Sequence, residues 1–148
     1  MDAGSRVGAS GISLVIPAYN EAAVIARAVR EAEAALAPAF ARYEIVVVDD
    51  GSSDATPAEV CAILGAAPHT RLLRHGFNRG YGAALRTGFE AARYELVAFT
   101  DADCQFDLAD LAELAARAEE TPVLVGYRRD RKDPWRRRFL SWGYNVLA

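Results

Sequence analysis

Short apolar runs alternate with amphipathic stretches along most of this chain of 148 residues. A short run that is rich in β-branched residues and bounded by polar residues or proline is typical of a buried parallel strand. Such runs predict strands at residues 12–17, 43–48, 71–74, 96–100 and 122–126. Apolar residues at helical spacing predict helices over residues 22–37, from about residue 56 to Gly65, over residues 83–92 and over residues 108–115.

Polar residues and prolines mark where these helices are expected to begin and end. Asn20 is the expected N-cap of the first helix, and Pro38 is expected to end it. Thr56 followed by Pro57 is typical of a helix start. Asp107 is well placed to cap the fourth helix, so each strand is expected to lead into a helix through a short polar loop.

The order of these elements predicts an α/β fold with an open, mostly parallel sheet and helices on both faces. We interpret residues 12–148 as one domain that follows a flexible N-terminus at residues 1–11. In such a sheet, ligands bind outside the carboxyl ends of the strands. The segments expected at those ends are residues 17–21, 49–54, 75–82, 101–105 and 126–129.

Asp101 and Asp103 directly follow a predicted strand and are the strongest candidates for metal ligands. Both carboxylates are able to reach one hard divalent cation, and the amide oxygen of Gln105 would serve as a third ligand. The alternative is that the two acids only cap the next helix or lie solvated in a turn. Asp107 is better placed as the cap, which leaves the pair without a structural task and favours the metal site.

A second acidic segment, residues 49–54, is expected in the same crevice. Gly51 permits a tight turn, and the carboxylates of Asp49 and Asp50 are suited to accept hydrogen bonds from a nucleobase or a ribose hydroxyl. Ser52 and Asp54 are equally well explained as turn residues that satisfy backbone groups. This segment alone therefore does not decide between a site and a turn.

Other conspicuous residues are interpreted as structural. The glycine-rich segment 78–82 matches neither common phosphate-binding pattern, which argues against a nucleoside triphosphatase. His69 and His75 lie in predicted loops without partners at ligand spacing and are expected to be solvated. Cys104 is interpreted as a small packed side chain, and two cysteines in all point to a chain kept reduced in the cytosol.

Charge is unevenly distributed along the chain. The formal net charge of −3 excludes a generally basic protein that coats nucleic acid. Residues 127–148 hold seven cations and two acids, a net charge of +5, and several aromatic side chains stand among the cations. This pattern predicts a helix at an anionic membrane surface, with a solvated amphipathic helix as the alternative. No targeting segment or membrane span is expected, so the predicted location is cytoplasmic and peripheral to the membrane.

Four short motifs occur in order along the chain. They are Pro17-Ala18-Tyr19-Asn20-Glu21, Asp49-Asp50-Gly51-Ser52-x-Asp54-x-Thr56, Asn78-x-Gly80-x-Gly82-x-Ala84 and Asp101-Ala102-Asp103-x-Gln105. In this order and spacing they resemble the family 2 glycosyltransferases of the GT-A fold. Within that family the chain is most similar to the dolichyl- and polyprenyl-phosphate mannosyl- or glucosyltransferases, and the resemblance covers nearly everything after residue 11.

The resemblance implies an inverting hexosyltransferase. It would move a sugar from a nucleotide diphosphate donor, GDP-mannose or a UDP-sugar, to a polyprenyl or dolichyl phosphate with the help of Mg²⁺ or Mn²⁺. The implied nucleoside pocket consists of Pro17, Tyr19, Glu21, Val48 and Asp50, together with Ala102. The implied metal ligands are Asp101, Asp103 and Gln105. The implied catalytic residues are Asp101, Asp103, Arg128 and Arg137, and Arg137 and Ser141 would meet the acceptor phosphate.

Alternatives to this activity remain open. A nucleotide-sugar-binding fragment or partner subunit would keep the metal site but show no transfer. A family 2 transferase that acts on a saccharide hydroxyl would need a catalytic base, and no acid after Asp110 is obviously placed as one. A nucleotidyltransferase would need a basic, glycine-rich segment that residues 17–21 do not provide. Because related catalytic domains are longer, we interpret the chain as the N-terminal, donor-binding portion of such a domain.

Overall fold

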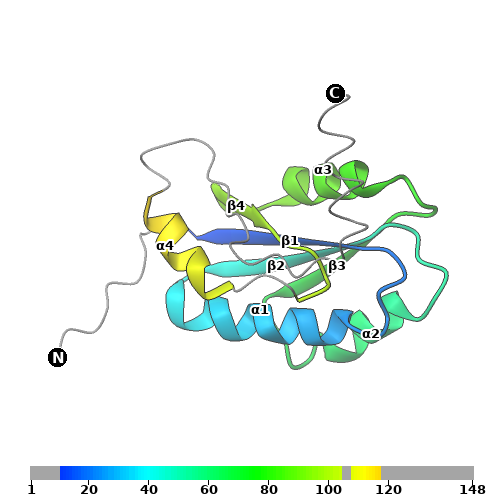
Figure 1. Ribbon diagram of the computed structural model, residues 1–148, viewed down its shortest axis with the longest axis horizontal. Coiled ribbons are helices and arrows are strands. Elements are labelled where there is room, and N and C mark those ends of the chain that lie inside the picture. Colours follow the sequence, from blue (N-terminus) through cyan, green and yellow to red (C-terminus); the bar gives the residue numbers. More distant parts are fainter. Residues whose placement is uncertain (1–10, 105–107, 118–148) are drawn as a thin grey trace, which may run out of the picture.

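The computed structural model describes residues 11–104 and 108–117, and the fold is described for these residues. Their elements follow the predicted alternation (Figure 1). They are β1 (Ile12–Ala18), α1 (Ile25–Ala39), β2 (Tyr43–Asp49), α2 (Thr56–Ile63), β3 (Thr70–Arg74), α3 (Tyr81–Ala91), β4 (Leu96–Phe99), the 3₁₀ helix η1 (Leu108–Asp110) and α4 (Leu111–Ala116). The strands form a parallel sheet in the order β3-β2-β1-β4. The α/β fold predicted from the sequence is therefore confirmed.

Helices cover both faces of the sheet, with α1 and α2 on one face and α3 on the other (Figure 1). Alternate side chains of β1 and β2 point to opposite faces, so each face has a core of its own. The α1 side contains Leu14, Ile16, Ile45 and Val47, whereas Val15, Val46 and Val48 pack toward Ala84 of α3. Burial on both faces explains why these strands read as continuous apolar runs in the sequence.

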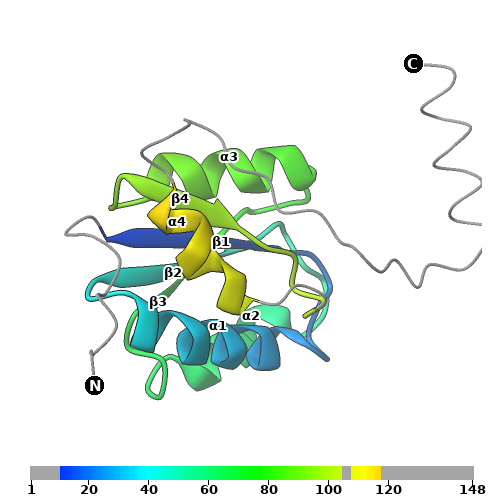
Figure 2. The same ribbon diagram turned by 60° about the vertical axis from the view of Figure 1, so that its left-hand side comes forward.

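The short helices after β4 pack against the α1 side of the molecule (Figure 2). Leu108 of η1 and Leu111 and Ala115 of α4 contact the core that α1 shares with the sheet. Asp110 is the N-cap residue of α4. The expected cap Asp107 and the expected strand at residues 122–126 lie outside the described residues. None of the helices in the described ranges is both long and apolar enough to cross a bilayer.

Two expectations about α1 are wrong. The helix begins at Ile25 rather than at residue 22, and the side chain of Asn20 does not cap it. Asn20 instead has a φ of 56° and its Oδ1 accepts a hydrogen bond from the Ser53 amide at 2.9 Å. Pro38 does not end the helix, which continues to Ala39. Pro38 has no amide N–H to donate to the carbonyl four residues earlier, and the helix ends one residue after it.

The other element boundaries lie close to the predicted ones. Helix α2 begins at Thr56 as expected, but the side chain that satisfies its first amide is Asp54, whose Oδ1 accepts from the Thr56 amide at 2.9 Å. Helix α3 begins at Tyr81, two residues before the predicted start. Gly80 precedes it with a φ of 93°, a conformation that favours glycine and allows the earlier start.

Gly88 lets α3 approach the sheet closely. A Cβ atom at this position would lie 2.3 Å from Cγ1 of Val15. We expect Gly88→Ala to lower the free energy of unfolding by about 1–3 kcal/mol because a well-packed core does not absorb an added methyl group. Urea denaturation measures the change. The matched control is Gly82→Ala in the same helix, where no atom lies within 4 Å. Equal stability of the two variants would contradict this packing.

A buried carboxylate joins the strands at the amino end of the sheet. Glu44 is 4% exposed, and its Oε1 accepts from Ser13 Oγ at 2.8 Å and from the Arg93 amide at 2.7 Å. Its Oε2 accepts from Arg71 Nε at 2.8 Å. Arg71 also donates to the carbonyl of Ala91. This network links β1, β2, β3 and the end of α3 at the edge opposite to the candidate site.

Candidate functional site

A cavity of about 450 Å³ lies at the carboxyl ends of the strands, where the fold class places ligands. It is formed by the loops that follow β1, β2 and β4 and by the segment that leads into α3. Its lining residues are Pro17, Ala18, Tyr19, Glu21, Asp50, Asn78, Gly80, Tyr81, Ala84, Asp101, Ala102 and Asp103. The structure therefore brings Pro17, Tyr19, Glu21, Asp50, Asp101, Ala102 and Asp103, all singled out from the sequence, to one cavity.

Asp50 holds the glycine-rich segment over the cavity. Its side chain is buried, and Oδ1 accepts from the Arg79 amide at 2.9 Å while Oδ2 accepts from the Gly80 amide at 2.8 Å. His75 Nδ1 lies 2.6 Å from Oδ1. Burial alone would raise the pKa of Asp50, but these hydrogen bonds hold the pKa below its ordinary value. Asp50 is thus an ionised anchor whose two oxygens already accept hydrogen bonds.

Gly51 allows the loop after β2 to lie close to the backbone of the segment that Asp50 anchors. It has a φ of 71°, and a Cβ atom there would lie 2.3 Å from the carbonyl carbon of Phe77. Only glycine fits both the left-handed backbone and the close approach of the 75–80 segment. The tight turn expected from the sequence therefore also brings the loop after β2 close to the 75–80 segment.

The expectation that His75 is solvated is wrong. The residue is 9% exposed, and its Nε2 lies 2.9 Å from Thr87 Oγ1 of α3. Its partners lie 25 and 12 residues away in the sequence, so no local spacing reveals them. His69 is exposed as expected, although its ring centroid lies 4.4 Å from that of Tyr43.

Removal of the His75 ring should loosen the anchor. We expect His75→Leu to lower the free energy of unfolding by about 1–3 kcal/mol, because it removes the contacts of His75 with the buried Asp50 carboxylate and with the Thr87 hydroxyl. His69→Leu is the matched control, since that ring is exposed and contacts the Tyr43 ring rather than the Asp50 anchor. Chemical denaturation of both variants measures the effect. A loss no larger than that of the control would show that the Asp50 anchor does not depend on His75.

The loop after β1 is fixed by side chains from the loop after β2. Ser52 Oγ accepts from the Asn20 amide at 2.9 Å, Thr56 Oγ1 accepts from the Glu21 amide at 2.8 Å, and Asp54 Oδ2 accepts from the Ala22 amide at 3.1 Å. The interpretation of Ser52 and Asp54 as residues that satisfy backbone groups is therefore right. Their contacts also serve the cavity, because they hold Tyr19 and Glu21 at its wall.

Asp101 and Asp103 lie on the loop after β4, and Asp101 has a partner that the sequence did not reveal. Its Oδ1 accepts a hydrogen bond from the hydroxyl of Tyr81 at 2.9 Å. Burial and the neighbouring carboxylate raise the pKa of Tyr81 to about 12, so the phenol is protonated near neutral pH. The expectation that Asp101 has no structural task is wrong to that extent.

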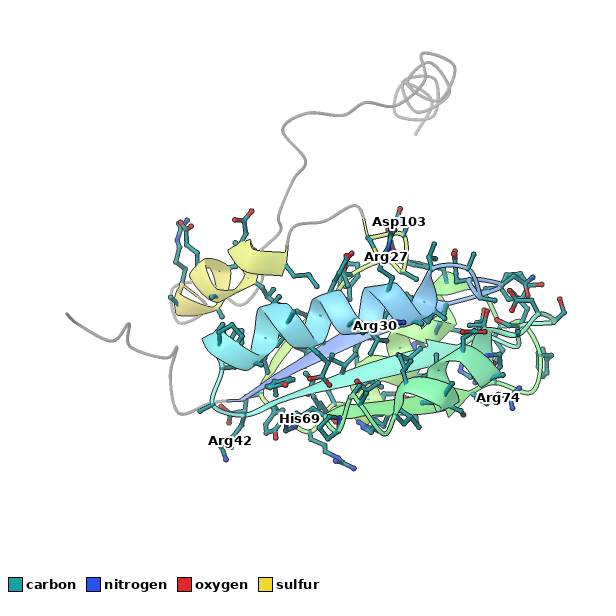
Figure 3. The ribbon with its side chains drawn as sticks, turned by 90° about the horizontal axis from the view of Figure 1, so that it is seen from below. Arg27, Arg30, Arg42, His69, Arg74 and Asp103 are labelled. Carbon is teal, nitrogen blue, oxygen red and sulfur yellow. The ribbon has the colours of Figure 1, made fainter. Side chains whose placement is uncertain are left out.

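Cys104 closes this loop against α1. Its backbone has a φ of 56°. Arg27 of α1 contacts its side chain and lies beside the loop that carries Asp103 (Figure 3). Burial raises the pKa of the Cys104 thiol and keeps it protonated. Both cysteines are free, and Cys104 is partly buried, in agreement with a packed side chain.

The donor set suits a cation that is shared with a ligand. Asp101 and Asp103 supply two carboxylates to the cavity, and the described residues contain no group of three or more histidines, cysteines or acids placed to hold a metal by themselves. Mg²⁺ and Mn²⁺ are commonly bound by one or two carboxylates together with waters and phosphate oxygens of a substrate. The residues present therefore fit such an ion.

The remaining predicted site residues fall into two groups. Val48 does not line the cavity, because its side chain is fully buried beside Val15 and Ala84. Gln105, Arg128, Arg137 and Ser141 lie outside the described residues. Conversely, Asn78, Gly80, Tyr81 and Ala84 line the cavity without having been named as site residues. Their position in the glycine-rich segment at a strand end was the signal that could have identified them.

A second hollow, of about 320 Å³, lies on α3 away from these carboxylates. It is lined by Arg79, Gly82, Ala83, Arg86, Thr87 and Glu90. With one acid and two arginines it does not offer the paired carboxylates that a phosphate-bridging cation needs.

Comparison with known proteins agrees with the resemblance seen in the motifs. Residues 13–146 match the model of the family described as glycosyl transferase family 2. The chain is 35% identical over 140 residues to the dodecaprenyl-phosphate galacturonate synthase of Rhizobium johnstonii, which covers 92% of this chain and 41% of that protein. It is 37% identical over 139 residues to the undecaprenyl-phosphate 4-deoxy-4-formamido-L-arabinose transferase of Edwardsiella ictaluri, with 92% and 42% covered.

Solved structures show the same fold. The mannosyltransferase PcManGT from Pyrobaculum calidifontis, in complex with GDP-Man and Mn²⁺, superimposes with a TM-score of 0.67 at 30% identity over 79% of this chain and 34% of its own. S. aureus TarS 1–349 gives 0.59 at 23% identity, over 84% and 38%, and supports the fold alone. The chain spans about two fifths of the length of the curated relatives. Its motifs, its GT-A-like sheet and the match over residues 13–146 show that the chain belongs to glycosyl transferase family 2.

Proposed function

We propose that this chain is the donor-binding part of a polyprenyl-phosphate sugar transferase. The cavity would bind a nucleotide diphosphate sugar and a divalent cation, and the sugar would pass with inversion to the phosphate of a polyprenyl lipid. The observation that carries the proposal is that one cavity contains both the paired carboxylates of Asp101 and Asp103 and the loop held by Asp50. The names of the relatives, which are polyprenyl-phosphate sugar transferases, support the acceptor.

Each wall of the cavity has a proposed role in binding the donor. Tyr19, with 47% of its surface exposed, offers an aromatic face to the nucleobase, while Pro17 and Glu21 complete that wall. Asp50 accepts from the amides of Arg79 and Gly80 and thereby holds this segment in place. The segment would then shape one side of the nucleoside pocket. Asp101 and Asp103 would hold the cation beside the diphosphate, and Ala102 between them lets the donor approach the loop closely.

The chemistry that this arrangement supports is stabilisation of a leaving group. When bound, a divalent cation neutralises negative charge that develops on the departing diphosphate. Fixed carboxylates keep that stabilisation in place without reorganisation during the reaction. A lipid phosphate is already anionic near neutral pH, so the transfer does not require a general base.

The residues proposed to bind the acceptor phosphate are identified from the sequence. Arg128, Arg137 and Ser141 are proposed to contact phosphate groups, and the basic segment 127–148 is proposed to lie at the cytoplasmic face of the membrane. Arginine suits this role because its guanidinium group forms paired hydrogen bonds with phosphate.

A transfer assay tests the proposed function. The chain is incubated with undecaprenyl phosphate, Mg²⁺ or Mn²⁺, and nucleotide sugars that carry mannose, glucose or galacturonate, and lipid products are identified by mass spectrometry. We expect a lipid-phosphate sugar that EDTA abolishes. Binding of the nucleotide sugar without any transfer would instead indicate a binding module. Transfer to a saccharide hydroxyl, but not to the lipid phosphate, would indicate a family 2 transferase that acts on saccharide acceptors.

A further inference from the structure

Tyr81 connects two parts of the cavity that bind different ligands in the proposed function. Its hydroxyl donates to Asp101 Oδ1 at 2.9 Å, so a hydrogen bond joins the start of α3 to the loop after β4. Tyr81 is 52% exposed and lines the cavity. Because the residue is exposed, core packing does not explain why its side chain is held in this position. Holding it there costs side-chain conformational entropy, which the hydrogen bond to Asp101 has to offset.

The backbone of Tyr81 is in turn positioned by Asp50. Gly80, its neighbour, donates its amide to Asp50 Oδ2 at 2.8 Å, and the Gly80 carbonyl accepts from the amides of Ala83 and Ala84 in the first turn of α3. A displacement of the anchored segment therefore displaces the Tyr81 side chain. A chain of contacts therefore runs from Asp50 through Gly80 and Tyr81 to the carboxylate of Asp101.

We propose that Tyr81 is a positioning residue that couples nucleotide binding to cation binding. By donating to Oδ1 of Asp101, the hydroxyl restrains the carboxylate, and Oδ2 would remain available to a cation. The inference rests on the proposed function, because it assumes that Asp101 is a metal ligand. Outer-shell partners of this kind typically change metal affinity about 10–100-fold when they are removed.

Coupling of this kind has a reciprocal signature. If a nucleotide stabilises the anchored segment and thereby the Tyr81 contact, it raises the affinity for the cation, and the cation raises the affinity for the nucleotide by the same factor. Removal of the hydroxyl should reduce both effects together. Without metal the loss of nucleotide affinity should be smaller than in Mn²⁺, because the phenyl ring and the backbone remain in place.

The test measures Mn²⁺ affinity by electron paramagnetic resonance of the free ion, with and without GDP and UDP, for the wild-type chain and for Tyr81→Phe. We expect the variant to bind Mn²⁺ about tenfold more weakly and to show a smaller enhancement by nucleotide. Its melting temperature should match that of Tyr94→Phe, and its nucleotide affinity should fall less in EDTA than in Mn²⁺. Tyr94→Phe is the matched control, since Tyr94 packs over Gly11 at the other end of the sheet.

Two outcomes separate this inference from the proposed function. Wild-type Mn²⁺ affinity in Tyr81→Phe, with normal binding by the unmodified chain, would overturn the role of Tyr81 alone. Failure of the wild-type chain to bind Mn²⁺ either alone or with a nucleotide would overturn the proposed function, and the coupling with it. A loss of Mn²⁺ affinity that appears equally in Tyr94→Phe would also contradict the inference, because that ring does not touch Asp101.

Discussion

Replacement of Asp103 by asparagine is expected to abolish the part of nucleotide-sugar affinity that depends on Mn²⁺. The substitution keeps the size of the side chain but removes the negative charge that a divalent cation requires. We expect the affinity in Mn²⁺ to fall by more than the roughly 100-fold that loss of an outer-shell partner can cost. Asp101→Asn should have a similar effect, because both carboxylates line the same cavity. Calorimetric titration in Mn²⁺ and in EDTA measures the loss.

The control for this prediction is Asp110→Asn. Asp110 is exposed at the N-cap of α4 and does not line the cavity, so its affinity for nucleotide sugar should equal that of the wild type. In EDTA, all of these chains should bind the nucleotide sugar equally weakly. Wild-type affinity of Asp103→Asn in Mn²⁺ would place the cation elsewhere.

Glu44→Gln is expected to lower the free energy of unfolding by about 3 kcal/mol. Removal of one member of a buried charge pair is costly because the partner is left uncompensated. Glutamine also replaces one acceptor oxygen by a donor group, which opposes either Arg71 Nε or the donors Ser13 Oγ and the Arg93 amide. Glu95→Gln is the control, since that residue is exposed and lies just before β4, which does not pair with the strand of Glu44. Urea denaturation near neutral pH measures both variants.

The difference between Glu44→Gln and the wild type should shrink in acid. Burial would raise the pKa of Glu44, but Arg71, Ser13 and the Arg93 amide hold the pKa below the ordinary value of 4.5. A carboxyl whose pKa is lowered on folding stabilises the protein above its ordinary pKa, and this contribution is lost as the pH falls through the lowered value. A difference that stays constant as the pH falls through this range would contradict a stabilising role for the charge.

The fold was largely predictable from local patterns. Strands β1 to β4 are buried or partly buried runs flanked by polar loops, and their boundaries lie within one residue of the predicted ones. The start of α1 was not predictable, because Asn20 bonds to Ser53 on another loop instead of capping the helix. Long-range hydrogen bonds of this kind compete with local capping preferences and leave no trace in residue spacing.

The candidate site was predictable where its residues follow strands directly. Asp50, Asp101 and Asp103 were found because the carboxyl ends of parallel strands meet at one edge of a sheet. His75 and Tyr81 were not, since their roles depend on partners that are 20 or more residues away. The position of Val48 was misjudged because it directly precedes the acidic turn yet points to the α3 face.

Paramagnetic broadening of backbone amide signals locates a bound Mn²⁺–nucleotide complex on the chain directly. We expect substoichiometric Mn²⁺ with GDP or UDP to broaden the amides of Ala18, Gly80 and Ala102, which surround the cavity, and to spare those of Arg42 and Arg93 at the opposite end of the sheet. Broadening centred on Arg86 and Glu90 in the hollow on α3, with sharp signals at Ala102, would contradict this expectation.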